Sequence, residues 1–162
     1  MTGGSDEKVE RALRLGASGG ALYRDPEWTR KIREQLPADR PWIDSVIDSA
    51  GGDICAQSLR AGIRGGGRVV VLGSTTSNAF TFTMREVMQN VELLGTTLGS
   101  ASEFKACIHF IEQNKIVPMV DTVLNGLDEA HRGFELLANS EKRGSGKVVV
   151  RIAEAAPVTA RV

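Results

Sequence analysis

Two runs of small polar residues are the strongest candidates for binding chemistry in this sequence. Residues 48–52 read DSAGG and residues 73–78 read GSTTSN, and each run directly follows a short apolar segment. Small side chains let a ligand approach the backbone, and hydroxyls both donate and accept hydrogen bonds. We see no reason in strand packing for these two runs to consist of such small residues, which favours a ligand-binding role. Six of them are candidate ligand-binding residues: Ser49, Ala50, Gly51, Gly73, Ser74 and Thr75.

The segment between the two runs indicates how they are positioned. Ile54, Leu59 and Ile63 recur at roughly helical spacing between the apolar segments 46–47 and 69–72. Strand, helix and strand of this length form one crossover unit, whose two strands run parallel. Ligands of open parallel sheets lie at the carboxyl ends of the strands, so we expect both runs at the same edge of the sheet.

The same alternation continues along the chain. Helical spacing predicts helices over about residues 5–15, 26–36, 85–89, 102–115 and 127–137. Short apolar segments predict strands near 21–23, 91–99, 118–124 and 148–152. Alternating strands and helices indicate a layered α/β fold with a parallel sheet. We expect one domain over residues 1–152 and a flexible tail over residues 153–162.

Composition narrows the functional class of this 162-residue chain. Hydrophobic residues make up 41% and charged residues 25%, with a formal net charge of zero, so a buried core is expected and a nucleic-acid partner is not. No apolar run approaches the length of a membrane span, so we expect no membrane association. The acidic start, without an apolar signal core, favours a cytoplasmic location.

The residues that most often bind metals or carry catalysis are scattered. Cys55 and Cys107 lie in apolar helical patterns and are expected to be reduced core thiols. His109 and His131 have no cysteine or second histidine at ligand spacing, so both are expected to be structural or solvated. We therefore predict no metal site and no catalytic residue in this chain.

Five segments, in order, resemble one enzyme family. They are GSDEKVERALRLGASGGALYRDPEW (4–28), IDSVIDSAGGD (43–53), GGRVVVLGSTT (66–76), NVELLGTTLGS (90–100) and RGSGKVVVRI (143–152). Together, over about residues 1–152, they resemble the cofactor-binding half of a medium-chain dehydrogenase/reductase, nearest to the alcohol dehydrogenase-like and quinone oxidoreductase-like branches.

The resemblance implies a Rossmann domain, a doubly wound parallel sheet that binds NAD(H) or NADP(H). Family members pass a hydride between the nicotinamide and a carbonyl, alcohol or activated alkene held by a second domain, and some branches use zinc. Against that pattern, this chain would lack the first strand, the glycine-rich phosphate turn and the first helix. The glycine runs 16–20 and 65–67 do not replace that turn, because neither leads from a strand into a helix.

The resemblance also assigns residues to the adenosine end of the cofactor. Ser5 and Lys8 follow the second family strand, where they would favour the 2′-phosphate of NADP(H), although Asp6 keeps NAD possible. The alternative is an N-terminally capped surface helix. Tyr23 and Arg24 end the next strand and would contact the same phosphate; the alternative is a tyrosine packed at a strand end.

The remaining assignments run toward the nicotinamide. Residues 48–52 would form the adenine-side turn, unless Asp48 caps the following helix, and residues 73–76 would lie beside the nicotinamide ribose. Gly99 would pass near the nicotinamide amide, or else belong to an edge strand. Lys147 would approach the cofactor, or else be a surface cation.

Three hypotheses follow. In the first, the chain is the nucleotide-binding half of an NAD(P)H-dependent oxidoreductase, with weak cofactor binding and no turnover alone, because hydride transfer needs a substrate held in place. In the second, it is a non-catalytic binding module that forms a homodimer through the strand Leu93–Thr97. In the third, it is a partial gene product.

Overall fold

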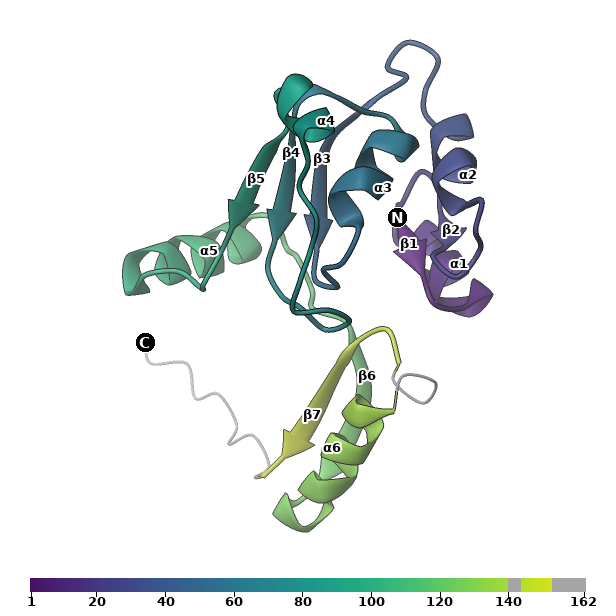
Figure 1. The fold of residues 1–162 in the computed structure, drawn as a ribbon. Coiled ribbons are helices and arrows are strands. Elements are labelled where there is room, and N and C mark those ends of the chain that lie inside the picture. Colours follow the sequence, from purple (N-terminus) through teal and green to yellow (C-terminus); the bar gives the residue numbers. More distant parts are fainter. Residues whose placement is uncertain (140–143, 153–162) are drawn as a thin grey trace. The chain divides into compact units, whose positions relative to one another are not determined.

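The computed structural model has alternating helices and parallel strands (Figure 1). It describes residues 1–139 and 144–152. The chain divides into two compact units, Met1–Glu103 and Phe104–Val162.

The first unit begins with a two-stranded module. Strands β1 (Thr2–Gly3) and β2 (Ala21–Leu22) pair in parallel and are connected by helix α1 (Asp6–Arg14). Acidic residues in the first turn of α1 and arginines in its last turn suit the helix dipole. Gly16 follows α1 with φ of 102°, a conformation that glycine adopts without strain.

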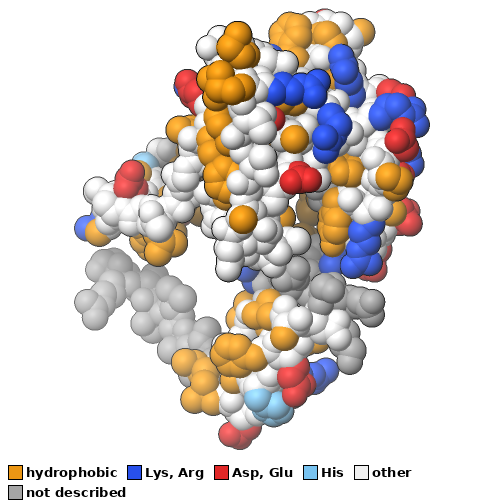
Figure 2. All heavy atoms as spheres, viewed as in Figure 1, with side chains coloured by type: hydrophobic (Ala, Val, Ile, Leu, Met, Phe, Trp, Pro, Cys, Tyr) orange, Lys and Arg blue, Asp and Glu red, His pale blue; other side chains and the backbone are white. Residues whose placement is uncertain are grey.

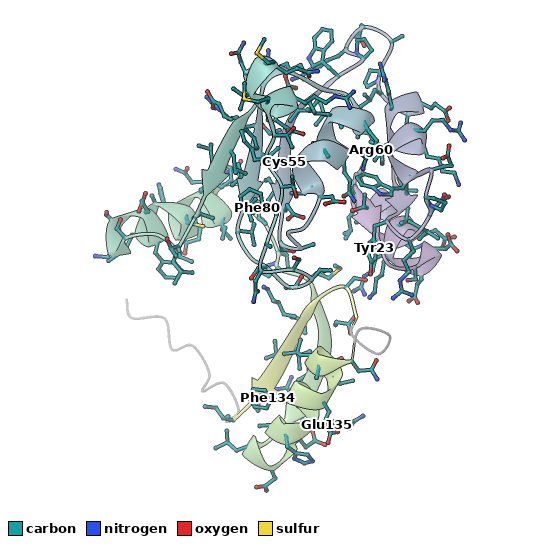
Figure 3. The ribbon with its side chains drawn as sticks, viewed as in Figure 1. Tyr23, Cys55, Arg60, Phe80, Phe134 and Glu135 are labelled. Carbon is teal, nitrogen blue, oxygen red and sulfur yellow. The ribbon has the colours of Figure 1, made fainter. Side chains whose placement is uncertain are left out.

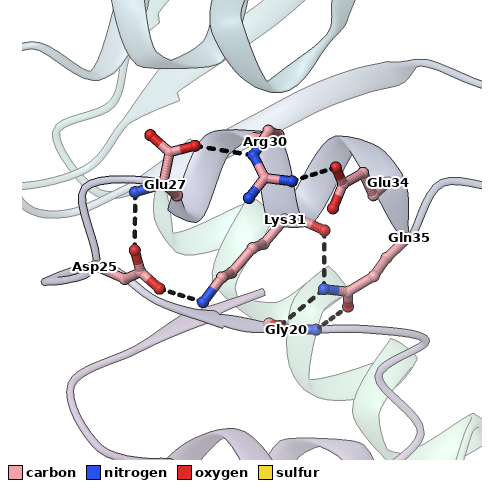
Figure 4. Close-up of polar contacts among 7 residues, drawn as sticks. All are labelled: Gly20, Asp25, Glu27, Arg30, Lys31, Glu34 and Gln35. Carbon is pink, nitrogen blue, oxygen red and sulfur yellow. Dashed lines mark hydrogen bonds and ion pairs between the residues drawn. The ribbon is translucent and has the colours of Figure 1, made fainter.

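Helix α2 (Trp28–Glu34) follows β2 and is held to it by polar contacts (Figure 4). The Gln35 side chain accepts a hydrogen bond from the Gly20 N–H at 2.8 Å and donates one to the Gly20 carbonyl at 3.2 Å. Asp25 contacts Lys31, a hydrogen bond that lowers the pKa of Asp25. The end of α2 is therefore fixed against the start of β2.

A three-stranded parallel sheet completes the first unit. Strands β3 (Ile43–Asp48), β4 (Ile63–Val71) and β5 (Glu92–Gly95) pair in that order. Helix α3 (Ile54–Ala61) connects β3 to β4, and helix α4 (Met84–Met88) precedes β5. A cluster of buried residues forms the core between sheet and helices: Cys55, Ile63, Val69 and Val91.

The boundary between the units falls within helix α5 (Ala101–Gln113). In the second unit, β6 (Val120–Asn125) and β7 (Lys147–Arg151) pair in parallel. A 3-10 turn (Leu127–Glu129) and helix α6 (Ala130–Ala138) follow β6. Gly133 of α6 lets the helix approach the sheet, since a Cβ there would lie 3.1 Å from Leu124 Cδ1.

The predicted α/β fold with parallel strands is confirmed, and one feature of its sheet differs. Among the described residues the strands form three separate ladders, β1–β2, β3–β4–β5 and β6–β7, instead of one continuous sheet. The predicted strand over residues 91–99 is shorter, because β5 ends at Gly95. The predicted tail, residues 153–162, lies outside the described residues.

The two cysteines behave differently. Cys55 is fully buried, as predicted, and burial raises the pKa of its thiol. Cys107 was expected in the core, but this is wrong: the thiol lies on α5, which buries none of its residues. Hydrophobic side chains are visible at the surface in Figure 2, and several exposed ones lie on α5 and α6, among them Phe104 and Phe134.

Candidate functional site at the carboxyl ends of β3, β4 and β5

The two small polar runs meet at the carboxyl ends of neighbouring parallel strands. Val46–Asp48 pair in register with Val69–Val71, so both runs leave the sheet at the same edge. The Thr75 N–H donates to the Ser49 carbonyl at 3.0 Å, and the Thr76 N–H donates to the Ala50 carbonyl at 3.0 Å. Six predicted site residues therefore lie together, as expected from the crossover unit: Ser49, Ala50, Gly51, Gly73, Ser74 and Thr75.

Close contact between the loops explains part of the smallness of these residues. A Cβ at Gly51 would lie 2.5 Å from the Ser77 carbonyl oxygen, and Gly51 also has φ of +80°. A Cβ at Gly73 would lie 3.2 Å from the Ser49 carbonyl oxygen. The expectation that packing gives no reason for small residues here is therefore wrong. Gly51 is therefore required by the fold whether or not a ligand binds, and the space at Gly73 is tight for a larger side chain.

Asp48 organises the first of these turns. Its side chain is buried, and Oδ2 accepts hydrogen bonds from the N–H groups of Gly51 at 2.7 Å and Ala50 at 3.1 Å. Asp53, not Asp48, occupies the N-cap position of α3. Asp48 therefore caps its own turn, and the alternative in which it caps the following helix is wrong.

A cavity of about 770 Å³ opens beside these loops. Its walls combine apolar side chains from β4, β5 and the loop between them with hydroxyl and amide groups from the loops. The residues lining it include Gly51, Gly73, Ser74, Leu93, Leu94 and Thr97. Such a mixture suits a flat ring that carries a polar substituent, since ligand pockets are mostly apolar with a few placed polar groups.

Several lining residues were not among the predicted site residues. Ser77 and Asn78 extend the polar run, and Asn78 Oδ1 accepts a hydrogen bond from the Ser74 hydroxyl at 3.3 Å. Phe80, labelled in Figure 3, reaches the cavity because its backbone pairs with Gly52. Thr96 and Thr97 follow β5. The signal for Thr96 and Thr97 was present in the sequence, since they are small polar residues directly after an apolar strand.

A second group of predicted residues gathers at the ends of β1 and β2. The Tyr23 N–H donates to the Gly3 carbonyl at 3.1 Å, and the ring lies over Gly4, where a Cβ would be 2.9 Å from the phenol oxygen. The Arg24 guanidinium lies 5.9 Å from the centre of the Tyr23 ring. The packing alternative for Tyr23 thus has support, although half of the side chain remains exposed.

Ser5 and Lys8 follow β1 directly. Ser5 occupies the N-cap position of α1, yet its side chain makes no capping hydrogen bond, so the hydroxyl is not needed by the helix. Within residues 1–139 and 144–152, neither Lys8 nor Arg24 forms an ion pair. The carboxylate next to Arg24, Asp25, contacts Lys31 instead. Two cations and one hydroxyl are thus available to an anion.

The last two predicted residues lie apart from these groups along the chain. Gly99 precedes α5, where the Glu103 carboxylate accepts a hydrogen bond from the Ser100 N–H at 2.7 Å. Lys147 begins β7 in the second unit, and its N–H donates to the Met119 carbonyl. Gly99 does not line the cavity at the ends of β4 and β5.

Comparison with known proteins identifies the family. Residues 15–150 match the family described as zinc-binding dehydrogenase. The chain belongs to this family. It is 37% identical over 157 residues to the zinc-type alcohol dehydrogenase-like protein YogA of Leptosphaeria maculans, a match that covers 94% of this chain and 43% of that protein. The chain thus spans less than half the length of this relative.

Solved structures agree on the fold. An NAD-dependent alcohol dehydrogenase is 30% identical with a TM-score of 0.77, over 94% of this chain and 43% of that one. A crotonyl-CoA carboxylase/reductase, AntE, in complex with NADP, is 24% identical with a TM-score of 0.77, over 92% and 42%. The predicted resemblance to medium-chain dehydrogenases and their Rossmann-like fold is confirmed.

The family name raises the question of zinc. In the parts of the chain that the structure describes, no three His, Cys, Asp or Glu side chains are grouped so that they could hold a metal ion. The described residues therefore do not fit a zinc site. The described helices also include none that is long and apolar enough to cross a bilayer.

Proposed function

We propose that residues 1–152 form a partial Rossmann domain that binds a nicotinamide dinucleotide for an oxidoreductase of the zinc-binding dehydrogenase family. The observation that carries the proposal is the cavity at the carboxyl ends of β4 and β5, bordered by Gly51, Gly73 and Ser74. Open parallel sheets bind ligands at this edge. The bound cofactor would supply hydride transfer to or from a carbonyl, alcohol or activated alkene.

The residues of this chain would bind and orient the cofactor. The mixed apolar and polar cavity suits the nicotinamide ring and its amide, with Ser74 and Thr97 offering hydroxyls. Ser49, Ala50 and Thr75 would act indirectly, because their backbone contacts hold the two loops together. Gly99 and Lys147 remain candidates for the nicotinamide end.

We further propose a preference for NADP(H), with NAD(H) as the alternative. Lys8 and Arg24 carry positive charge without an ion pair to any described residue, and the Ser5 hydroxyl makes no cap. Ionised donors bind phosphate oxygens more strongly than neutral donors do. Asp6 lies next to Ser5 and is exposed, and its charge would reduce this preference.

The residues 1–162 alone are expected to bind cofactor weakly and to catalyse no turnover, because they span less than half of the matched relative.

A second candidate function is assembly. Among the described residues, β5 is paired along one edge, since this strand ends the order β3–β4–β5, and Leu94 is 43% exposed. The strand Leu93–Thr97 could therefore pair with a second copy to form a homodimer. We place either function in the cytoplasm.

Isothermal titration calorimetry with NADPH and NADH tests the proposal. The chain should bind NADPH detectably, and Ser74→Trp should abolish the signal because the indole would fill the cavity. Thr76→Trp is the matched control, since Thr76 is exposed in the same loop and does not line the cavity. Binding that is absent, or equally weakened by both substitutions, would contradict the proposal.

A further inference from the structure

Four exposed arginines gather at the amino ends of β3 and β4. They come from the end of α2, the loop before β3, the end of α3 and the start of β4: Arg33, Arg40, Arg60 and Arg64. Figure 2 shows Lys and Arg side chains gathered over this part of the first unit. We call these four residues the arginine patch. It lies at the opposite end of β3 and β4 from the cavity beside Gly73, and none of the four lines that cavity.

Contacts at the end of α3 bring three members of the arginine patch together. Gly62 ends α3 in a left-handed conformation, and a Cβ there would lie 3.6 Å from Arg33 Cγ. The stem of Arg33 therefore packs over Gly62. Arg60 and Arg64 are each two residues from Gly62, a separation that the chain spans in at most about 7 Å. The three guanidinium groups thus extend from neighbouring points of one surface.

The carboxylates nearby balance only part of this charge. Arg40 contacts Asp44 Oδ2, and Arg64 Nε lies 2.9 Å from Asp44 Oδ1, so two guanidinium groups share one carboxylate. Each guanidinium has five N–H donors, most of which Asp44 does not use. Asp39, in the same loop as Arg40, is the other acid close by in the sequence. Four cations therefore face two carboxylates, and the patch stays positive.

The remaining two arginines have no acidic partner within residues 1–139 and 144–152. Neither Arg33 nor Arg60 forms an ion pair there. The contrast along α2 is informative, because its other cations, Arg30 and Lys31, are both paired with carboxylates (Figure 4). Pairing on this helix stops at the residue that contacts the end of α3. Two guanidinium groups are thus available to carboxylates of another molecule.

The composition of the arginine patch favours a protein partner over a nucleic acid. All four cations are arginines, and Trp42 beside them is 40% exposed. The Trp42 N–H donates to the Arg40 carbonyl at 2.8 Å, which fixes the loop. Arginine and tryptophan are enriched among the residues that dominate protein interfaces. Guanidinium groups also match carboxylates in shape, as the shared Asp44 illustrates. The zero net charge of the chain does not favour nucleic acid.

We propose that the arginine patch is a docking surface for an acidic segment of a partner protein. Carboxylates of this segment pair with Arg33 and Arg60, and an apolar side chain of the segment packs against Trp42. The surface is separate from the proposed cofactor site, because its residues lie at the amino ends of the strands. The inference therefore stands whether or not a nicotinamide dinucleotide binds.

Fluorescence anisotropy with a labelled acidic peptide tests the inference. The probe is fluorescein-Glu-Asp-Leu-Glu-Asp-Leu-Glu-amide, which offers carboxylates and leucines. It should bind the chain saturably, and its affinity should fall as salt is raised from about 0.05 M to 0.15 M, because salt screens exposed charges. The same peptide with glutamine and asparagine in place of its acids should not bind. Binding of this neutral peptide, or tighter binding of a single-stranded oligonucleotide of equal charge, would overturn the inference.

Substitutions then locate the binding surface. Arg33→Glu and Arg60→Glu should each weaken peptide binding by at least about tenfold, as for a lost charged hydrogen bond. Arg60→Lys should bind with intermediate affinity, because lysine keeps the charge without the planar fork. Arg14→Glu on α1 is the matched control, since it makes the same change in net charge outside the patch. Equal losses for Arg14→Glu and Arg60→Glu would show attraction by net charge alone and would refute a defined docking surface.

Discussion

Two groups of residues at the strand ends of the first unit use similar chemistry for different purposes. In the loops after β3 and β4, the described polar groups are mostly bonded to one another: Asp48 to two N–H groups, Thr75 to Ser49, and Ser74 to Asn78. After β1 and β2, the Ser5 hydroxyl makes no cap, and Lys8 and Arg24 form no ion pair within the described chain. The first group is bonded within the protein around the cavity that it borders, whereas the charges of the second group have no internal ion pair among the described residues.

This difference separates stability from binding. Groups bonded within the protein lose stability when they are removed, because their partners become unsatisfied. Charged groups without internal partners contribute little to stability, and removing them should alter only the binding of an anion. Substitutions in the first group should therefore lower stability, and substitutions in the second group should lower anion affinity.

The largest effect is expected at Gly51. Gly51→Ala should destabilise the fold by about 3 kcal/mol, because an alanine is strained at φ of +80° and its Cβ would meet the Ser77 carbonyl at 2.5 Å. Urea denaturation measures the change. Gly95→Ala is the control, because a Cβ there meets nothing within 4 Å; it should be neutral or stabilising by up to about 1 kcal/mol. Equal effects would refute the packing role.

The next largest effect is expected at Asp48. Asp48→Ala should cost about 2 kcal/mol, since the N–H groups of Ala50 and Gly51 lose their acceptor. Asp53→Ala should change the unfolding free energy by no more than about 0.5 kcal/mol, because Asp53 makes no capping hydrogen bond. Chemical denaturation of both variants compares them directly. If Asp53→Ala were the more harmful, the turn held by Asp48 would not be the main stabilising feature of this segment.

Much of this arrangement could be predicted from the sequence. The crossover unit between Val46 and Leu72 predicted that both loops lie at the same edge of the sheet, because the two strands of such a unit run parallel and end on the same side. The role of Gly51 could not be predicted, since it depends on how closely Ser77 approaches across the loops. Cys107 shows a different failure: helical spacing indicates an apolar face but not whether anything covers it.

The sheet itself illustrates the same limit. Each strand was predictable from its short apolar run, but pairing between strands depends on what lies beside each edge. Among the described strands, β1 does not pair with β3 and β5 does not pair with β6 or β7, so three ladders replace the single sheet that the alternation predicts. Lys8 and Arg24 were predictable as cations at strand ends, whereas their lack of ion pairs to other described residues is visible only in the structure.

The third prediction concerns these two cations. Lys8→Ala and Arg24→Ala should each weaken NADPH binding by about tenfold, as for a lost charged hydrogen bond, and leave NADH binding unchanged. Stability should shift by no more than about 0.5 kcal/mol. Calorimetry with both dinucleotides measures the discrimination, and Lys105→Ala on α5 controls for net charge. An equal loss of affinity for NADPH and NADH would mean that the two cations do not bind the 2′-phosphate.

The smallest effect tests an internally satisfied carboxylate away from the loops. Glu86 is buried, and Oε2 accepts hydrogen bonds from the Thr83 hydroxyl and the Thr83 N–H, forming a capping box at α4. These hydrogen bonds lower the pKa of Glu86. Its ionised form therefore stabilises the folded state, and this contribution is complete above the unfolded-state pKa.

Glu86→Gln should destabilise the fold by about 1 kcal/mol at neutral pH, because a neutral amide replaces the charged acceptor of the cap. The difference from the unsubstituted chain should shrink as the pH falls below about 4.5 and through the lowered folded-state pKa, because protonation removes the same charge. Thermal denaturation between about pH 7 and pH 3 measures this convergence. A constant difference in stability over that range would contradict this prediction. It would mean that the charge of Glu86 does not contribute to the stability of the capping box at α4.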